Sequence, residues 1–400
     1  MVEQYDILII IVSAVILALS LLSPLVNIFF RSRKLNLTEE EEETETVTGE
    51  QATAPPPLSV IITPHDNARD LEQNLPLILE QDYPAAYEVI VVVSKGEDDT
   101  DDVLKRLQSK YQHLYVTFIP DSSRYMSRKK LAVTLGVKAA HHAWICMTEP
   151  TSQPSSKNWL RRMAQGCTEE NDMVVGYTNY DDNTSAYKRF ETLYNQLYLF
   201  RSALKGIAYR HAGTNLLFKK DLFMNGRGYE GNLKYIRGEY DFIVNKYAEK
   251  GNTAVVLTPE AYTVESEPTQ KSWRNTHLFY MESRKHLSRS VKHRLINNTD
   301  TLLLHLNWLM IVAGLTAAGV LLASDSQQPY HWLLLGASLI ACCVTIVMRT
   351  IMGNKVIHHF HEDIPAWKII FYEISVFWHR LYYMIQYAKA DKYDFISHKL

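Results

Sequence analysis

The chain has few cysteines, and their spacing matches no metal site. Its 400 residues include four cysteines, and two of them are adjacent within an apolar run: Cys146, Cys167, Cys342 and Cys343. Structural zinc sites need cysteine or histidine pairs at short, regular spacings, which are absent here. We therefore expect reduced packing residues, in agreement with a reducing compartment around the soluble part of the chain.

The sequence also lacks the features of a nucleic-acid-binding protein, because it has no basic helix and no platform of interleaved aromatic residues. The formal net charge of −2 is misleading, since seven of the 44 acidic residues lie between Glu39 and Glu50. The rest of the chain carries 37 acidic residues against 42 Lys and Arg. This positive balance suits a membrane surface or a phosphate-bearing substrate.

The first long apolar run, Ile7–Phe30, has no basic segment before it, which disfavours a cleaved signal peptide. The run is long enough to cross a bilayer, and the basic stretch Arg31–Lys34 follows it directly. The sequence therefore predicts an anchor over residues 1–34 whose C-terminal side is cytoplasmic. Residues 35–56 are acidic, then Pro-rich, and lack apolar periodicity, which is typical of a solvated linker.

Two further apolar runs occur at Thr301–Ala323 and Trp332–Met352, within a region from 291 to 355. The loop between them, Ser324–His331, contains no Lys or Arg, whereas basic residues flank the outer ends of the runs. The positive-inside rule places this loop outside and both flanks in the cytoplasm. All three spans therefore predict a soluble domain that faces the cytoplasm.

The C-terminal region, residues 356–400, contains a segment that mixes apolar and charged residues, Ala366–Tyr387. Its aromatic and aliphatic content favours an amphipathic helix at the membrane interface, and a packed cytoplasmic helix is the alternative. A fourth span is not expected, because Glu373, His379 and Arg380 interrupt the run.

The region from 57 to 290 begins with two predicted strands separated by a helix. The runs Val60–Ile62 and Val89–Val93 are continuous, which is typical of parallel strands covered on both faces. Apolar residues at helical spacing in Leu71–Leu79 predict the crossover helix. Ligands bind at the carboxyl ends of such strands, so we expect the loops that follow them to line a site. Similar patterns predict further helices and strands, at Val103–Tyr111, Tyr115–Ile119, Lys129–His141, Ala143–Met147, Trp159–Gly166 and Ser185–Leu204.

Several ordered segments of this region resemble one known family. They are similar in sequence to family 2 inverting glycosyltransferases. The segments are Leu58–Asn67, Glu88–Thr100, Lys129–Ala132, Met147–Pro154 and Gly238–Asp241. The resemblance implies the GT-A fold, a Rossmann-like mixed α/β sheet domain that uses nucleotide sugars, here joined to transmembrane helices. It also implies a pocket for base and ribose, a means of neutralising the leaving diphosphate, and a base for the acceptor hydroxyl.

The chain departs from that family at the Asp-x-Asp motif, which usually holds the divalent metal that neutralises the diphosphate. Glu149 and Thr151 replace the two aspartates here. Glu149 can still give a carboxylate to Mg²⁺ or Mn²⁺, whereas Thr151 can ligate only weakly or through water. A weakened metal site, a metal-independent site and an inert site all remain open at this point.

The expected nucleotide-binding residues also differ from those of the family. Ser94 stands at the end of the second strand, where the family commonly has Asp. In the loop after the first strand Pro64 and Asn67 are kept, Ala68 replaces a Glu, and Asp66 is a partial substitute. Nucleotide recognition is therefore expected, although the base cannot be read from these residues.

Three consecutive cations, Arg128, Lys129 and Lys130, resemble the family's Lys-bearing segment before the next helix. We expect at least one of them to contact the diphosphate and to stabilise the leaving group. A solvated, basic start of a helix is the alternative.

On the acceptor side of the site, the sequence matches the family at several positions. Asn215 lies in a segment similar to the strand beneath the acceptor, and we expect it to touch a sugar hydroxyl or to hold a turn. Glu239 is the preferred general base, with Asp241 in support or at the helix N-cap. Arg284 lies in a segment similar to a helix that covers donor and acceptor. Trp273 before it is expected to be a packing or membrane-surface residue, and a platform for a sugar is the alternative.

These features predict a membrane-bound, hexosyl-type inverting glycosyltransferase of the bacterial inner membrane, with its catalytic domain in the cytoplasm. Its partners would be a nucleotide sugar and a lipid-linked or envelope-glycan acceptor, as in cell-envelope polysaccharide biosynthesis. The alternative is a catalytically degenerate GT-A module that acts as a scaffold in an envelope-assembly complex. The changes at Ala68, Ser94, Glu149 and Thr151 motivate that alternative, and the retained Glu239 argues against it.

Overall fold

The computed structural model describes residues 2–32, 54–65, 67–94, 99–119 and 127–396. These residues belong to two compact units. The helical unit comprises Met1–Asn36 and Val291–Arg380, and the sheet unit comprises Leu37–Ser290 and Leu381–Leu400. Most of the linker expected at 35–56 lies outside the described residues, as does Asp66.

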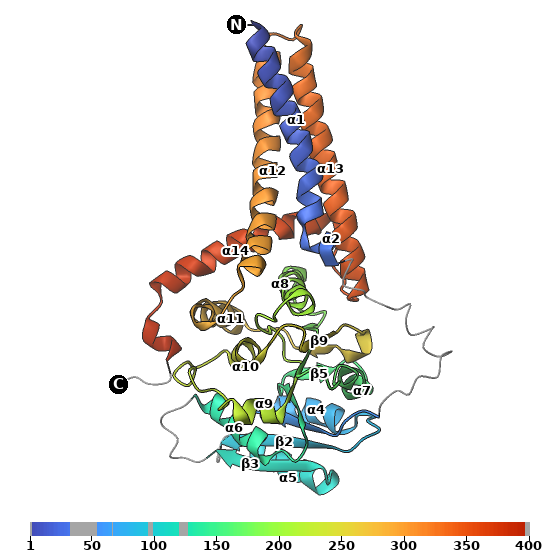
Figure 1. The fold of residues 1–400 in the computed structure, drawn as a ribbon, viewed down its shortest axis with the longest axis vertical. Helices are drawn as coiled ribbons and strands as arrows, with labels where there is room; N and C mark the ends of the chain where they lie inside the picture. Colours follow the sequence, from blue (N-terminus) through green and yellow to red (C-terminus); the bar gives the residue numbers. More distant parts are fainter. Residues whose placement is uncertain (1, 33–53, 66, 95–98, 120–126, 397–400) are drawn as a thin grey trace, which may run out of the picture. The chain divides into compact units, whose positions relative to one another are not determined.

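The sheet unit contains a mixed sheet of seven strands in the order β3-β2-β1-β4-β8-β6-β9 (Figure 1). The bounds of these strands are β1 Leu58–Ile62, β2 Tyr87–Ser94, β3 Leu114–Ile119, β4 Trp144–Thr148, β6 Met173–Gly176, β8 Leu216–Lys219 and β9 Thr253–Val256. The first four pair in parallel, whereas β8 pairs antiparallel with both β4 and β6. A smaller sheet has the order β5-β10-β7, with β5 Ser152–Pro154, β7 Thr178–Tyr180 and β10 Thr263–Glu265.

Helices connect and cover these strands. They are α4 Ala68–Leu79, α5 Thr100–Lys110, α6 Arg128–Ala139, α7 Trp159–Ala164, α8 Ala186–Lys205, α9 Lys220–Asn225, α10 Glu239–Tyr247 and α11 Gln270–Ser283. Each helix and strand predicted between residues 57 and 205 is present, and the ends differ from the prediction by no more than three residues. The long apolar runs explain this agreement, because a buried strand leaves little choice of register.

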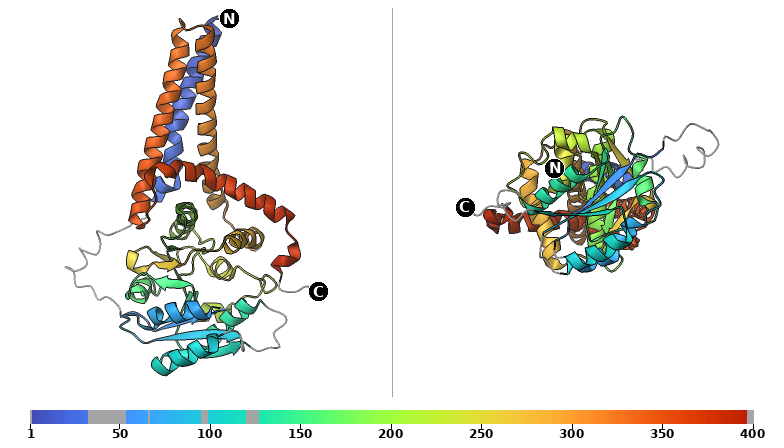
Figure 2. Two further views of the ribbon diagram at one scale, coloured as in Figure 1. Left: turned by 180° about the vertical axis from the view of Figure 1, so that it is seen from behind. Right: turned by 90° about the horizontal axis from the view of Figure 1, so that it is seen from below.

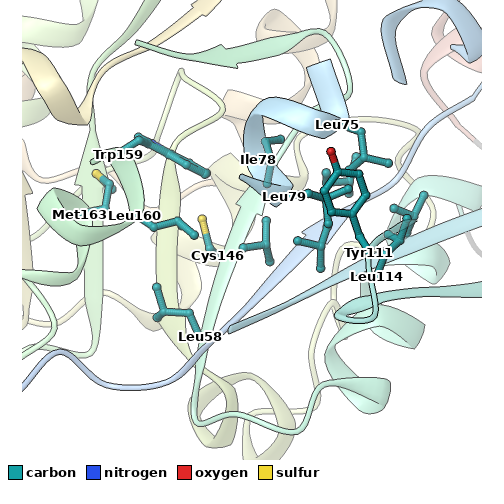
Figure 3. Close-up of a cluster of buried hydrophobic side chains, with 14 of the residues drawn as sticks. Leu58, Leu75, Ile78, Leu79, Tyr111, Leu114, Cys146, Trp159, Leu160 and Met163 are labelled. Atoms are coloured by element: carbon teal, nitrogen blue, oxygen red, sulfur yellow. The ribbon is translucent and has the colours of Figure 1, made fainter. Parts of the chain in front are cut away.

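Both faces of the parallel strands are covered, as their continuous apolar sequences predict. On one face, Val60 and Val91 belong to a cluster with side chains of α4, α5 and α7 (Figure 3). On the other face, α6 packs closely on the sheet, because a Cβ at Gly136 would lie 2.8 Å from Ile61. This close approach fixes α6, and its first turn therefore has a defined position beside the strands.

The helical unit is built from α1 Val2–Val26, α2 Ile28–Ser32, α12 Val291–Ser324, α13 Pro329–His359 and the first part of α14 Ile369–Lys389 (Figure 2). Three of these helices, α1, α12 and α13, are long and apolar enough to span a membrane. Between 22% and 28% of their most apolar stretches is buried, so most of that apolar surface faces outward, as it does in lipid. Small residues allow close packing, since Gly314 lies against Ser338 and Ile16.

Candidate functional site

A pair of opposite charges lies at the carboxyl end of β4. Glu149 follows that strand directly, Lys129 lies in the first turn of α6, and the Lys129 Nζ to Glu149 Oε1 distance is 2.5 Å. The Tyr240 hydroxyl donates a second hydrogen bond to Glu149. Burial opposes a charged Lys129, but the carboxylates of Glu149 and Glu239 outweigh it and raise the pKa of this lysine. Lys129 is therefore a stable cation at this edge of the sheet.

Glu239 is the first residue of α10, and the residue before it fixes its position. Gly238 is the N-cap and has a φ of +95°, a left-handed conformation that favours glycine. Glu239 is 5% exposed, and its Oε1 is buried without a hydrogen-bond partner among the described residues. Buried carboxylate oxygens are normally satisfied, so an exception beside a lysine is a mark of a functional site.

Asp241 has a different environment from Glu239. Its Oδ1 accepts a hydrogen bond from Arg210 Nη1 at 3.1 Å, and its Oδ2 accepts one from Ser283 Oγ at 3.3 Å. The helix-cap alternative for Asp241 is wrong, because Gly238 is the N-cap and no side chain caps α10. Asp241 therefore joins α10 to the end of α11, which favours the supporting role over that of the base.

Glu265, at the end of β10, is a further carboxylate near this cluster that the sequence patterns did not reveal. It accepts hydrogen bonds from Ser152 Oγ at 3.4 Å and from Thr214. Burial, and then the charge of Glu149, raise the pKa of Glu265 to about 7. It reaches the cluster through the small sheet, in which β10 pairs with β5 at Ser152, and no local motif signals that pairing.

His211 is a second residue that the sequence patterns missed. It is 3% exposed, and its Nε2 has no partner within the part of the chain that the structure describes. Burial and the neighbouring Arg210 lower the pKa of His211 to about 3, so the ring is neutral. Its ring centroid lies 6.3 Å from that of Tyr240, which bonds Glu149.

Lys130 points away from this cluster, although it follows Lys129 directly. It is fully buried and donates to the carbonyl oxygens of Asn232 at 3.0 Å, of Arg237 at 3.3 Å and of Tyr235. Burial lowers the pKa of Lys130 to about 8. The geometry thus gives this lysine a structural role, in place of the expected phosphate contact, in the loop that leads to Gly238.

Asn215 is also occupied by structural hydrogen bonds. Its Nδ2 donates to Ala261 O at 2.8 Å and to Tyr177 O at 3.3 Å, and its Oδ1 accepts from Trp159 Nε1 at 3.1 Å. The side chain is fully buried, and Gly176 packs so closely that a Cβ there would lie 2.4 Å from it. This arrangement matches the structural alternative for Asn215 and not the sugar contact.

The nucleotide-binding candidates lie at the carboxyl edge of the neighbouring strands β1 and β2. Pro64 is buried two residues after β1, and Ser94 is 7% exposed at the end of β2. Asn67 accepts from the His65 backbone N–H at 3.1 Å and donates to Asp70 at 2.7 Å, which orders the start of α4. Arg128, at the start of α6, is exposed.

Two candidates on or after α11 differ in burial. Trp273 is 6% exposed and packs with its ring 5.9 Å from that of Tyr180, so it is a packing residue. Arg284 is half-buried and directly follows Ser283, which contacts Asp241. No hydrogen bond or ion pair of the Arg284 guanidinium is found among the described residues, which leaves this cation available to a ligand.

Among the described residues, the side chains around Glu149 do not form a divalent-metal site. Glu149 already bonds an ammonium and a hydroxyl, and Thr151, two residues on, is a weak ligand. Across the described ranges, no group of three or more His, Cys, Asp or Glu side chains could hold a metal ion.

Comparisons with known proteins bear on the family and the fold of the chain. The family model for glycosyl transferase family 21 matches residues 7–377. It supports the expected glycosyltransferase class and does not confirm family 2. The comparison with curated proteins gives no match.

Two solved structures match the chain over most of its length. The mannosyltransferase PcManGT from Pyrobaculum calidifontis, in complex with GDP-Man and Mn²⁺, shares 17% identity with a TM-score of 0.50, over 83% of this chain and 98% of that chain. S. aureus TarS 1–349, in complex with UDP-GlcNAc, shares 13% identity with a TM-score of 0.41, over 82% and 91% of the two chains. The first likeness, together with the mixed sheet, confirms the expected fold class.

Proposed function

Because the chain belongs to glycosyl transferase family 21, we propose that its sheet unit moves a hexosyl group from a nucleotide sugar to an acceptor hydroxyl. The observation that carries the proposal is Glu239, whose buried Oε1 has no partner among the described residues. An acceptor hydroxyl would supply the missing hydrogen bond and then lose its proton to this carboxylate. A single displacement of this kind inverts the configuration at the sugar carbon.

The remaining groups of the acceptor side hold Glu239 in place. Gly238 sets the entry to α10, and the carbonyl bonds of Lys130 order the loop before it. Asp241, through Arg210 and Ser283, joins the first turn of α10 to the end of α11. A base needs such a support, because small displacements cost much of the rate.

On the donor side, Lys129 is proposed to neutralise the leaving diphosphate. Its ammonium has three N–H donors and gives one to Glu149, so donors remain for phosphate oxygens. Arg128 and Arg284 are further cations that can reach an anionic ligand, and Pro64, Asn67 and Ser94 are proposed to receive the base and ribose. This arrangement favours a metal-independent reaction, since the lysine occupies the carboxylate that would otherwise hold Mg²⁺ or Mn²⁺.

The acceptor is proposed to be membrane-associated, as a lipid-linked or envelope glycan would be. Three helices are long and apolar enough to span a membrane, and the loop between the last two lacks Lys and Arg. By the positive-inside rule, this pattern supports a multi-pass protein of the bacterial inner membrane with the sheet unit in the cytoplasm, where nucleotide sugars are found.

The test is nucleotide release by the full-length chain purified in detergent. UDP-, GDP-, dTDP- and CMP-sugars would be incubated with membrane lipid extract, with Mn²⁺ or with EDTA. The expected result is EDTA-resistant release that is lost in Glu239→Gln and kept in the matched control Glu72→Gln, whose carboxylate is exposed on α4.

Three results would contradict parts of this proposal. Full release by Glu239→Gln would remove Glu239 as the base. Release that requires Mn²⁺ would assign Glu149 a ligand role and overturn the role of Lys129. No release and no nucleotide binding across the panel would favour a scaffold without catalytic activity.

A further inference from the structure

Helix α14 carries a stripe of large apolar side chains, each at least half exposed. Phe371 is 60% exposed, Trp378 56%, Tyr382 52% and Ile385 50%. Their spacing of seven, four and three residues places all four on one side of the helix, which we call the outer face. Large exposed apolar groups gathered on one side of a helix mark a surface that is normally covered.

The opposite side of α14 is buried, and we call it the inner face. In the helical unit, Ile369 packs against Gly353, where a Cβ would lie 2.8 Å away, and Val376 is 6% exposed. In the sheet unit, the Tyr383 ring stacks on His277 with 4.2 Å between centroids. The helix therefore has a packed apolar face and an exposed apolar face, unlike an ordinary amphipathic helix of a soluble protein.

Polar bonds in the helical unit show where along the spans α14 is held. Glu373, on the inner face, accepts from Arg349 Nε at 2.8 Å and from Arg349 Nη2 at 3.2 Å. It also accepts from Asn27 Nδ2 at 2.5 Å, and Arg349 reaches Asp300 at 3.3 Å. Asn27 directly follows α1, and Asp300 directly precedes the apolar run Thr301–Ala323. The partners of α14 thus lie where the apolar segments end, at the level of a membrane boundary.

We propose that the outer face of α14 lies in the lipid headgroup region, with the helix along the membrane surface. Within the helical unit, Glu373 holds the first part of α14 at the ends of the spans, so Phe371 and Trp378 lie at the level where the apolar segments end. Trp and Tyr are the residues that favour this region of a bilayer. Lys389 lies on the same side of the helix, four residues after Ile385, and Lys368 directly precedes the helix, which suits anionic headgroups. Arg380 lies on the inner face and donates to Asn297 Oδ1 at 3.0 Å.

This proposal distinguishes between the two interpretations of the segment that the sequence left open. The inner face is packed as a cytoplasmic helix would be, and the outer face is that of an interfacial helix. A helix across the bilayer would instead have to carry Glu373 and Arg380 through lipid, at a large cost.

The test uses tryptophan fluorescence of the full chain in vesicles of phosphatidylcholine and phosphatidylglycerol, with and without lipids brominated near the headgroup. Phe371→Trp adds a fluorophore on the outer face. The matched control is Tyr115→Trp, at a 49% exposed aromatic position on β3. We expect the bromolipids to quench the added emission of Phe371→Trp at least twofold and that of Tyr115→Trp not at all.

A second pair of variants, each lacking one native tryptophan, tests the proposal without an added fluorophore. Trp378→Phe should remove a quenchable share of the emission, whereas Trp144→Phe, at a 5% exposed position in the sheet, should remove only unquenched emission. Equal quenching of Phe371→Trp and Tyr115→Trp would overturn the proposal. In that case chemical cross-linking would be the next measurement. Cross-links between the α14 helices of two chains would show that a second copy, and not lipid, covers the outer face.

Discussion

The two units each contain a cluster of buried charges, and the clusters differ in how completely their hydrogen bonds are made. In the helical unit, Arg349 uses all five of its N–H donors, on Glu373, Asp300 and Ser23. In the sheet unit, Glu239 keeps an oxygen and His211 a ring nitrogen without a partner among the described residues.

This difference distinguishes a cluster that holds helices together from one that can bind a ligand. A charged side chain whose N–H donors are all occupied can hold helices together, but it has no donor left for a ligand. A buried carboxylate oxygen without a partner costs stability, and that cost is retained where a substrate supplies the missing bond.

Glu239→Gln should lower turnover by roughly 10²- to 10⁴-fold, the usual contribution of a general base. The apparent Tm should not fall, because the substitution removes a poorly satisfied charge. Turnover would be measured by nucleotide release, and unfolding by a thermal scan in the same detergent. Asp241→Asn is the comparison, and it should lower Tm because it weakens the bond to Arg210. A variant of Glu239 that unfolds easily yet keeps its turnover would make Glu239 a structural residue.

Arg349→Met should destabilise the helical unit by roughly 3–5 kcal/mol, because it leaves the carboxylates of Asp300 and Glu373 buried and unpaired. Denaturant unfolding at fixed detergent concentration measures this loss. The double variant Arg349→Met/Glu373→Met should recover part of the stability, since one of the two orphaned charges is removed. If the single and double variants were equally unstable, the charge network would not be what holds α14.

Lys129→Met and Lys130→Met form a matched pair of adjacent substitutions. Lys129→Met should lower turnover by roughly 10²- to 10³-fold, as the loss of a charge-stabilising donor does elsewhere. Lys130→Met should instead cost roughly 1–3 kcal/mol of stability, because carbonyl oxygens of the loop at 232–237 lose their donor. Turnover per folded molecule and Tm, measured on both variants, separate the two roles. The reverse pattern would exchange the two assignments.

Glu265→Gln should have the smallest effect, a change in how stability depends on pH. The native pKa of about 7 lies above the usual value of 4.5, so the folded protein binds this proton more tightly than the unfolded chain. The contribution of Glu265 to stability is complete below pH 4.5 and is lost as the pH rises through 7. Apparent Tm between pH 5 and 8 should therefore fall less steeply in Glu265→Gln than in the unchanged chain. Identical slopes would show that Glu265 is ionised throughout this range.

The fold was largely predictable from the sequence, because its strands and spans are long, continuous apolar runs such as Val89–Val93 and Ile7–Phe30. The site was less so. Lys129 and Lys130 have the same chemistry, and only their 100° separation around α6 sends one toward Glu149 and the other into a loop. Glu265 depends on a small sheet whose three strands are far apart in the sequence.

One expectation failed for a local reason. The N-cap interpretation of Asp241 rested on the preference of Asp for helix starts, but a left-handed glycine already begins α10. Asn215 shows the same limit in another form, because its position in a motif did not reveal that three hydrogen bonds already occupy its amide.

The helical unit is discontinuous along the chain, and this order has a consequence for biosynthesis. Helix α1 is made first, whereas its neighbours α12 and α13 begin only at Val291 and Pro329. At synthesis rates of roughly 5–20 residues per second, α1 exists without these neighbours for roughly 15–60 seconds. Insertion into a membrane during that interval would depend on the apolar surface of α1 itself, and α1 is the most apolar of the three candidate spans. Most of the sheet unit has that same interval in which to fold, before α12 and α13 are made.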